Sequence, residues 1–313
     1  MVSNSTSELG VPCVSVIMPA HNAANTISTT MASLVSERAY ILELIVIDDG
    51  STDDTAAVAR SSAAELGLPI VLASTNFRDA GSARNHGISR ARGRWVYFLD
   101  ADDTHEAGGL RALVAAGEGP QAPELVLGSY YIQRRDRDRS LFRHRPERLS
   151  AEEYLAGAAV VIVIGCGLIL RSALDGQRFP GPLAYDEDTL FWAAMLACCR
   201  IAIVGAAVMT YHVSLQRSDE RLVRDSRRSF EQWRRSLLAL EDRGIRRVAL
   251  GRREAFMGIR VARIHLRRGE LADARHFLTL ARRAPKTGAD AYRWLRFRVK
   301  LAMRQGFGRP GLR

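Results

Sequence analysis

The chain has 313 residues, 47% of them hydrophobic and 25% charged, which is enough for one large core and is typical of a soluble globular enzyme. Its formal net charge of +11 favours anionic partners such as phosphates, acidic lipid headgroups or nucleic acid. Four cysteines without CxxC spacing exclude a disulfide scaffold of the secreted type and favour reduced thiols, so we expect a cytoplasmic chain.

The first third of the chain predicts strands that alternate with helices. Residues 1–12 are Ser-rich and lack the apolar stretch of a signal peptide, so we expect a disordered leader. Alternation of strands and helices predicts an α/β fold with an open, mostly parallel sheet and right-handed crossovers. The expected strands are 14–18, 42–47, 70–73 and 95–99, and the expected helices are 24–36, 52–66 and 81–92.

The rest of the chain predicts more strands and then a change of composition. The apolar stretch 156–170 is too short to span a bilayer, so we interpret it as core. After residue 218 the pattern becomes Arg-rich and helical, which predicts a basic helical extension over 218–313. We therefore expect one main domain over 13–217, with halves 13–104 and 105–217. Within it we expect strands at 125–131 and 201–211, a charged hairpin or loop at 134–148, and helices at 151–159 and about 186–199.

Polar residues follow three of the expected strands, at Pro19–Asn22, Asp48–Asp49 and Asp100–Asp103. The carboxyl ends of parallel strands line one crevice, so these residues should converge. Like charges as dense as Asp100, Asp102 and Asp103 resist burial unless a cation neutralises them, and Mg²⁺ and Mn²⁺ prefer such oxygen ligands. The alternative is the start of a helix with acids in its first turn.

Together these motifs resemble the family 2 type glycosyltransferases of GT-A fold, which transfer sugars with inversion. The resemblance covers about residues 14 to 215. It implies a GT-A glycosyltransferase domain over 13–217, with a donor half and an acceptor half, and a nucleotide-diphosphate-sugar donor. The motifs that carry it are Val14–Asn22, Ile45–Asp53, Asn76 with Gly81–Ile88, Ala91–Gly93 and Phe98–Asp103.

The resemblance also implies roles for single residues. His21 stands where relatives usually carry a Tyr that stacks on uracil, and with Pro19 and Asp49 it would contact the base. Arg84 would lie near the base or the diphosphate, and Asp103 would bind Mn²⁺ or Mg²⁺. His212 is either a further metal or phosphate contact, in a flap with Arg217 and Ser218, or only a polar residue at a strand end. The donor-binding set is Pro19, Ala20, His21, Asn22, Asp49, Gly81, Arg84 and Asp102, and the metal set is Asp103, Asp102 and His212.

A second acidic motif, Tyr185–Phe191, resembles the one that precedes the acceptor-side helix in this family. There Asp188 would serve as the catalytic base. Inverting transfer is a single in-line displacement, in which a carboxylate takes the acceptor proton while a metal stabilises the departing diphosphate. Glu187 competes with Asp188 for this role. The alternative is that the acids only cap a helix.

The segment Ala291–Arg304 interleaves apolar residues with Arg and Lys, which is typical of a helix lying on anionic lipid. We therefore expect either contact with the inner face of the plasma membrane or a terminal helix docked on its own domain. Membrane contact would suit an acceptor that is a lipid-linked glycan or a cell-surface polymer precursor, with a UDP-sugar as donor. A non-catalytic nucleotide-binding relative remains an alternative, as does a nucleic-acid-binding protein, although only charge supports the latter and we expect no nucleic acid.

Overall fold

The computed structural model describes residues 12–135, 137–146, 149–157, 161–213, 222–283 and 288–306. The chain forms two compact units. The first comprises residues 1–147, 162–182 and 198–214, and the second comprises residues 148–161, 183–197 and 215–313. Residues 1–11 of the expected leader, and Arg217 and Ser218 of the expected flap, lie outside the described residues.

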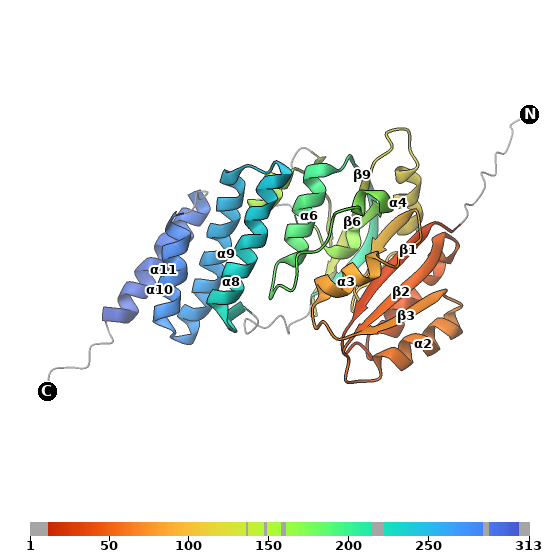
Figure 1. Cartoon of the computed structure of the whole chain (residues 1–313), viewed down its shortest axis with the longest axis horizontal. Coiled ribbons are helices and arrows are strands. Elements are labelled where there is room, and N and C mark those ends of the chain that lie inside the picture. Colours follow the sequence, from red (N-terminus) through yellow and green to blue (C-terminus); the bar gives the residue numbers. More distant parts are fainter. Residues whose placement is uncertain are drawn as a thin grey trace, which may run out of the picture. The chain divides into compact units, whose positions relative to one another are not determined.

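The first unit is built on one mixed sheet with strand order β3-β2-β1-β4-β8-β6-β9-β5, and β7 pairs with β6 (Figure 1). The pairs among β1 to β4 are parallel, as expected, and so is β6 with β9. The strand β8 was not predicted, and it runs antiparallel between β4 and β6. The strands are β1 Val14–Ala20, β2 Ile41–Asp49, β3 Ile70–Thr75, β4 Trp95–Phe98, β5 Thr104–His105, β6 Leu125–Gln133, β7 Ser140–Phe142, β8 Gly167–Leu170 and β9 Ile201–His212.

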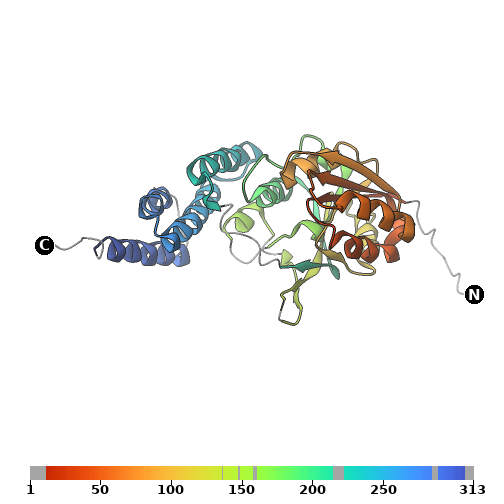
Figure 2. The same cartoon turned by 90° about the horizontal axis from the view of Figure 1, so that it is seen from below.

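Helices flank this sheet, and α1 and α2 lie side by side (Figure 2). Helix α3 approaches β1 closely, because a Cβ on Gly87 would stand only 2.4 Å from Cγ2 of Ile17. Every residue of β1 is buried, which explains its run of apolar residues. The helical segments of this unit are α1 Ile27–Ser33, η1 Val35–Tyr40, α2 Thr55–Leu66, α3 Ala80–Ile88, α4 Gly109–Gly117, η3 Ile164–Cys166 and η4 Arg171–Leu174.

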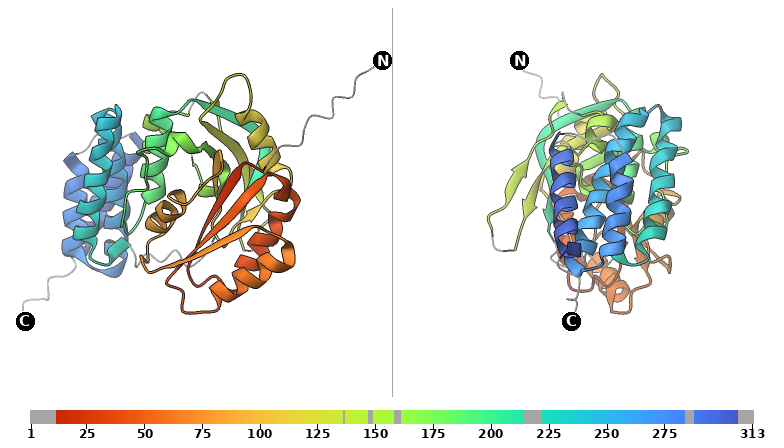
Figure 3. Two further views of the ribbon diagram at one scale, coloured as in Figure 1. Left: turned by 45° about the vertical axis from the view of Figure 1, so that its right-hand side comes forward. Right: turned by 90° about the vertical axis from the view of Figure 1, so that its left-hand side faces the viewer.

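A buried glutamate determines where α4 begins. The carboxylate of Glu37 accepts hydrogen bonds from the backbone N–H groups of Gly108, at 2.5 Å, and Arg111, at 2.9 Å. The first N–H groups of a helix have no partner within the helix, so a distant side chain satisfies them here. Elsewhere in this unit, the charged segment after β6 forms the expected hairpin with β7 (Figure 3).

The second unit is helical, as expected for the C-terminal region. Helices α8 to α11 lie side by side (Figure 3), and α9 approaches α10 closely because a Cβ on Gly258 would stand 3.2 Å from the carbonyl oxygen of Phe277. None of the described helices of the chain is long and apolar enough to cross a membrane. The helical segments are α5 Ala151–Leu155, α6 Glu187–Cys198, α8 Ser226–Leu238, η5 Ala239–Arg243, α9 Arg247–Arg268, α10 Leu271–Arg283 and α11 Gly288–Gly306.

Candidate active site

The turns that follow β1 and β2 are tied together by hydrogen bonds. Nδ1 of His21 donates to the backbone carbonyl of Asp49 at 2.8 Å, which determines which ring nitrogen carries the proton. Asn22, in the left-handed region at φ 51°, accepts through Oδ1 from the backbone N–H of Thr52 at 2.8 Å. The structure therefore brings together the expected donor residues of the first two strand ends, with Pro19 and Ala20 paired in register with Ile47 and Asp48.

The carboxylate of Asp49 is buried, and it orders the segment that follows β3. Its Oδ1 accepts from the hydroxyl of Thr75 at 2.9 Å and from the backbone N–H of Phe77 at 2.6 Å. Its Oδ2 accepts from the backbone N–H of Asp79 at 2.8 Å. Asp49 therefore organises the loop leading into α3, and its contact with the base stays a prediction.

Helix α3 carries two further residues of the expected donor set. Asp79 caps its N-terminus by accepting from the backbone N–H of Ser82 at 2.7 Å, and Gly81 lies buried in the first turn. Arg84 is 4% exposed, and its Nη2 lies 2.7 Å from Oδ1 of Asp100. This ion pair joins α3 to the end of β4 and neutralises the first acid of the predicted metal cluster.

The remaining acids of this cluster lie in a turn that leads into β5, so the alternative of a helix start is wrong. Asp103 is 3% exposed, and its Oδ1 accepts from the backbone N–H of His212 at 2.8 Å. The ring of His212 in turn bonds through Nε2 to the hydroxyl of Thr104 at 3.0 Å. Pairing of β5 with β9 thus brings together Asp103 and His212, which are 109 residues apart in sequence, whereas Asp102 is exposed.

The described part of the chain contains no group of three His, Cys, Asp or Glu side chains that could hold a metal alone. Mg²⁺ and Mn²⁺ nonetheless bind commonly through one or two carboxylates together with substrate phosphates. Asp102 and Asp103 are adjacent in sequence, and the backbone of His212 bonds to Asp103. These carboxylate oxygens fit a divalent ion that is shared with a diphosphate.

Sequence reasoning missed the buried polar residues behind this turn. Nε2 of His105 accepts from the backbone N–H of Leu110 at 3.2 Å, so Nδ1 carries the proton and donates to the hydroxyl of Tyr97, also at 3.2 Å. That hydroxyl donates to the carbonyl of Gly165 at 2.7 Å. Burial lowers the pKa of His105 to about 4, so the ring is neutral at pH 7. The one sequence signal that could have identified His105 is its position directly after the acidic motif Asp100–Asp103.

A second buried histidine lies in the same unit. Nε2 of His144 is 3.7 Å from Sγ of Cys166, next to the aromatic ring of Phe142. Burial lowers the pKa of His144 to about 4 and raises the pKa of Cys166 to about 12. Both groups are therefore neutral at pH 7, and neither belongs to the predicted site.

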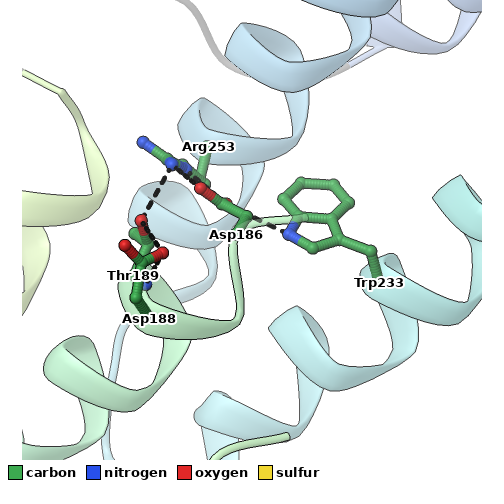
Figure 4. Close-up of polar contacts among 5 residues, drawn as sticks. All are labelled: Asp186, Asp188, Thr189, Trp233 and Arg253. Atoms are coloured by element: carbon green, nitrogen blue, oxygen red, sulfur yellow. Dashed lines mark hydrogen bonds and ion pairs between the residues drawn. The ribbon is translucent and has the colours of Figure 1, made fainter. Parts of the chain in front are cut away.

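The predicted base lies at the start of α6, in the second unit (Figure 4). Oδ1 of Asp188 accepts from the backbone N–H of Thr189 at 2.7 Å. Asp186 lies before the helix with φ 68°, and its buried carboxylate forms an ion pair with Arg253. We expected the helix to begin at about residue 186, but Asp186 precedes it, and the acids of its first turn are Glu187 and Asp188. Arg253 was not predicted, because no local pattern marks it.

Comparison with known proteins identifies relatives of this chain. The model of the family described as Glycosyl transferase family 2 matches residues 15–176. The chain is 28% identical, over 88% of its length and 78% of the relative, to the succinoglycan biosynthesis protein ExoO of Rhizobium meliloti. It is 27% identical, over 66% of its length and 78% of the relative, to the UDP-Glc:alpha-D-GlcNAc-diphosphoundecaprenol beta-1,3-glucosyltransferase WfgD of Escherichia coli.

Among solved structures, the chain is similar to the mannosyltransferase PcManGT from Pyrobaculum calidifontis, determined in complex with GDP-Man and Mn²⁺. The TM-score is 0.56 and the sequence identity 19%, and the match covers 95% of this chain and 85% of the other. At this identity the likeness concerns the fold. It includes the mostly parallel sheet and the helical C-terminal region.

Proposed function

Because the chain belongs to glycosyl transferase family 2 and is a glycosyltransferase of GT-A-like fold, we propose that it transfers a sugar, with inversion, from a UDP-sugar to a hydroxyl group of a lipid-linked glycan or cell-surface polymer precursor. One observation carries most weight. Asp49, at the end of β2, accepts hydrogen bonds from His21 in the turn after β1 and from the backbone N–H of Asp79 before α3, and Arg84 of α3 pairs with Asp100 after β4. The polar strand ends thus form one connected set.

The donor would lie against these turns, as in other α/β sheets that bind ligands at the carboxyl ends of their strands. The hydrogen bond from Nδ1 restrains the imidazole of His21, which leaves a flat ring for stacking on the base. The choice of a UDP-sugar is supported by the relative named for UDP-Glc. Asp49 would act chiefly by holding the loop before α3, and Asp102 would reach the ribose.

Asp103 and Asp102 would hold the divalent ion, with His212 as the neighbouring ligand or phosphate contact. A bound Mn²⁺ or Mg²⁺ would supply positive charge for the departing diphosphate. The chain itself contributes a rigid carboxylate, because Asp103 is buried and bonded to the backbone of β9. A restrained carboxylate loses little freedom when it binds a cation, which favours binding.

Asp188 would take the proton of the acceptor hydroxyl as its oxygen attacks the anomeric carbon, while the bond from that carbon to the diphosphate breaks. Support comes from its place in the motif and from the hydrogen bond to Thr189, which restrains its carboxylate. Glu187 lies next to it in the first turn of α6 and serves as the natural control.

The exposed face of α11 supports contact with an anionic membrane surface. Trp294 and Leu301 anchor the helix: Nε1 of Trp294 donates to the carbonyl of Leu278 in α10 at 2.8 Å, and Leu301 is buried. The other side leaves large apolar side chains exposed at helical spacing, among basic residues that complement anionic headgroups. The apolar residues are Tyr292, Leu295, Val299 and Met303, and the basic ones are Arg296, Arg298 and Lys300.

Calorimetry with UDP-glucose, UDP-GlcNAc and GDP-mannose, with and without Mn²⁺, tests the donor site. We expect a UDP-sugar to bind best and Mn²⁺ to strengthen its binding. Asp103→Asn keeps the size of the side chain and should abolish the effect of Mn²⁺. Equal binding with and without Mn²⁺ in the wild type would reject the role of Asp103.

Replacement of Asp188 by Asn tests the base. We expect donor binding to stay and sugar transfer to fall by roughly a hundredfold or more, as is typical when a general base is lost. Glu187→Gln is the matched control and should retain most turnover. The opposite result for the two variants would assign the base to Glu187.

Vesicle co-sedimentation tests the membrane surface, using phosphatidylcholine vesicles with and without phosphatidylglycerol. We expect binding only with the anionic lipid and weaker binding for Leu295→Glu, which alters an exposed residue. Binding that is unchanged by this substitution would exclude this face of α11. Dimers of the wild type that Leu295→Glu dissociates would assign the face to a second copy of the chain.

A further inference from the structure

The acidic motif of α6 is held by a residue far away in the sequence. Arg253, in α9, forms two contacts with the carboxylate of Asp186: Nε lies 3.0 Å from Oδ2, and Nη2 bonds to Oδ1. The side chains are 10% and 6% exposed, respectively. Nε1 of Trp233 in α8 donates to the same carboxylate at 3.1 Å. Asp186 is therefore linked to both α8 and α9 (Figure 4).

The same guanidinium also contacts the segment that carries Asp188. Nη2 of Arg253 donates to the hydroxyl of Thr189 at 3.2 Å, and the backbone N–H of Thr189 donates to Asp188. The buried Tyr154 of α5 is hydrogen-bonded to Thr189, and its pKa is raised well above the ordinary value by burial and next by the charge of Asp188. Arg253 thus binds the residue before the Glu187–Asp188 pair and the residue after it.

Two costs weigh against this arrangement as a source of stability. A buried ion pair seldom stabilises more than apolar residues of equal size would, because both charges must leave water. Asp186 also adopts a left-handed backbone, which is unfavourable for a residue that is not glycine. The ion pair of Asp186 and Arg253 instead fixes the direction in which the chain enters α6.

We propose that Arg253 is a positioning residue, which orients Asp188 for proton transfer by clamping Asp186 and Thr189 on either side of it. The proposal rests on the proposed role of Asp188 as base. It assigns a part in the reaction to α9, which lies outside residues 15–176 of the family match. In this proposal Arg253 acts through Asp186 and Thr189, not through contact with the substrate.

The charges of the pair give the proposal a testable signature. Asp188 is faced by Arg253 from α9 and Tyr154 from α5, and it is flanked in its own segment by Asp186 and Glu187. In the wild type the charges of Arg253 and Asp186 balance. Removal of one partner leaves an uncompensated charge beside Asp188, whereas removal of both leaves none.

The experiment compares Arg253→Met, Asp186→Asn and the double variant in the full-length protein. The readout is release of UDP from UDP-glucose with Mn²⁺, where water replaces the acceptor hydroxyl. We expect kcat to fall roughly tenfold to a hundredfold in all three, with donor affinity within about twofold of the wild type. Arg246→Met is the control, because the exposed Arg246 pairs with the partly exposed Glu152 in the same unit.

The pH–rate profile distinguishes positioning from general stability. In Arg253→Met the unpaired carboxylate favours the protonated base, so the acid limb of kcat should move to higher pH. In Asp186→Asn the unpaired guanidinium should move it to lower pH. The double variant should regain thermal stability, and the acid limb of its pH–rate profile should lie near that of the wild type. Its kcat should nevertheless stay as low as in the single variants.

Two outcomes would overturn the proposal. One is a double variant that regains kcat together with stability, since the pair would then be only structural. The other is single variants that match Arg246→Met in kcat and in pH profile. Failure of the proposed base is separate, because it would appear as full turnover in Asp188→Asn whatever the variants of Arg253 do.

Discussion

The replacement Asp49→Asn removes one acceptor from a carboxylate that takes three hydrogen bonds. If the amide oxygen takes the place of Oδ1, the bonds from Thr75 and Phe77 remain. The amide nitrogen then faces the backbone N–H of Asp79, and two donors cannot bond. Loss of a bond to a charged group and burial of an unpaired N–H together cost about 3 kcal/mol.

Urea denaturation of the two proteins measures this cost. Asp48→Asn is the matched control, because the side chain of the partly exposed Asp48 accepts one hydrogen bond within the described part of the chain, from the backbone N–H of Ser51 at 3.2 Å, and we expect a loss below about 1 kcal/mol. Donor affinity should fall with stability in Asp49→Asn, since the loop before α3 loosens. A variant as stable as the control that no longer binds UDP-sugar would refute this reasoning and leave Asp49 as a base contact only.

Three further predictions concern the same unit. The native pKa of His105 and of His144, about 4, lies below the ordinary 6.5, so the unfolded state takes up protons first as the pH falls. The free energy of unfolding should therefore decrease between pH 6.5 and 4, by roughly 2 kcal/mol per histidine at pH 5. Urea denaturation at several pH values measures this decrease, and a flat profile would contradict the prediction. Gly87→Ala should destabilise by about 1–3 kcal/mol in thermal unfolding despite better helix propensity, because its Cβ would overlap Ile17; a stabilised variant would refute this. Glu37→Gln should cost about 1–3 kcal/mol, since its amide cannot accept from both N–H groups at the start of α4, and unchanged stability would exclude this role.

The parallel strands β1, β2 and β4 were predictable because burial on both faces leaves a direct mark on the sequence. The run that forms β1 is wholly buried, and the expected strand 14–18 differs from it only at its C-terminal end. Helix α3 was expected to reach residue 92 but ends at Ile88, and the backbone N–H of Arg92 bonds instead to Glu43 at 2.8 Å. Strand β8 was missed because four residues within a longer apolar stretch carry no period of their own.

Without the family resemblance, the residues of the candidate site could be located only where they follow strands, whereas Arg84 and Asp188, which lie on helices, were named from the resemblance. Asp49 and Asp103 lie at the ends of apolar runs, which topology then brings to one edge of the sheet. The partners of these acids come from elsewhere in the chain: His212 contributes a backbone N–H, which no side-chain pattern can reveal. Arg253 lies 67 residues after Asp186 and looks, in sequence, like any arginine of a basic helix.

The path of the chain through its second unit restricts how this protein can be shortened or recombined. The chain enters that unit three times, and Asp186 belongs to the second passage while Arg253 belongs to the third. A family member that ends before α9 would leave a buried carboxylate without its cation, so we expect such proteins to carry a glycine or a neutral residue at this position. The two sites should therefore covary across the family, and a chimera that exchanges the C-terminal helices should require residue 186 to be exchanged with them.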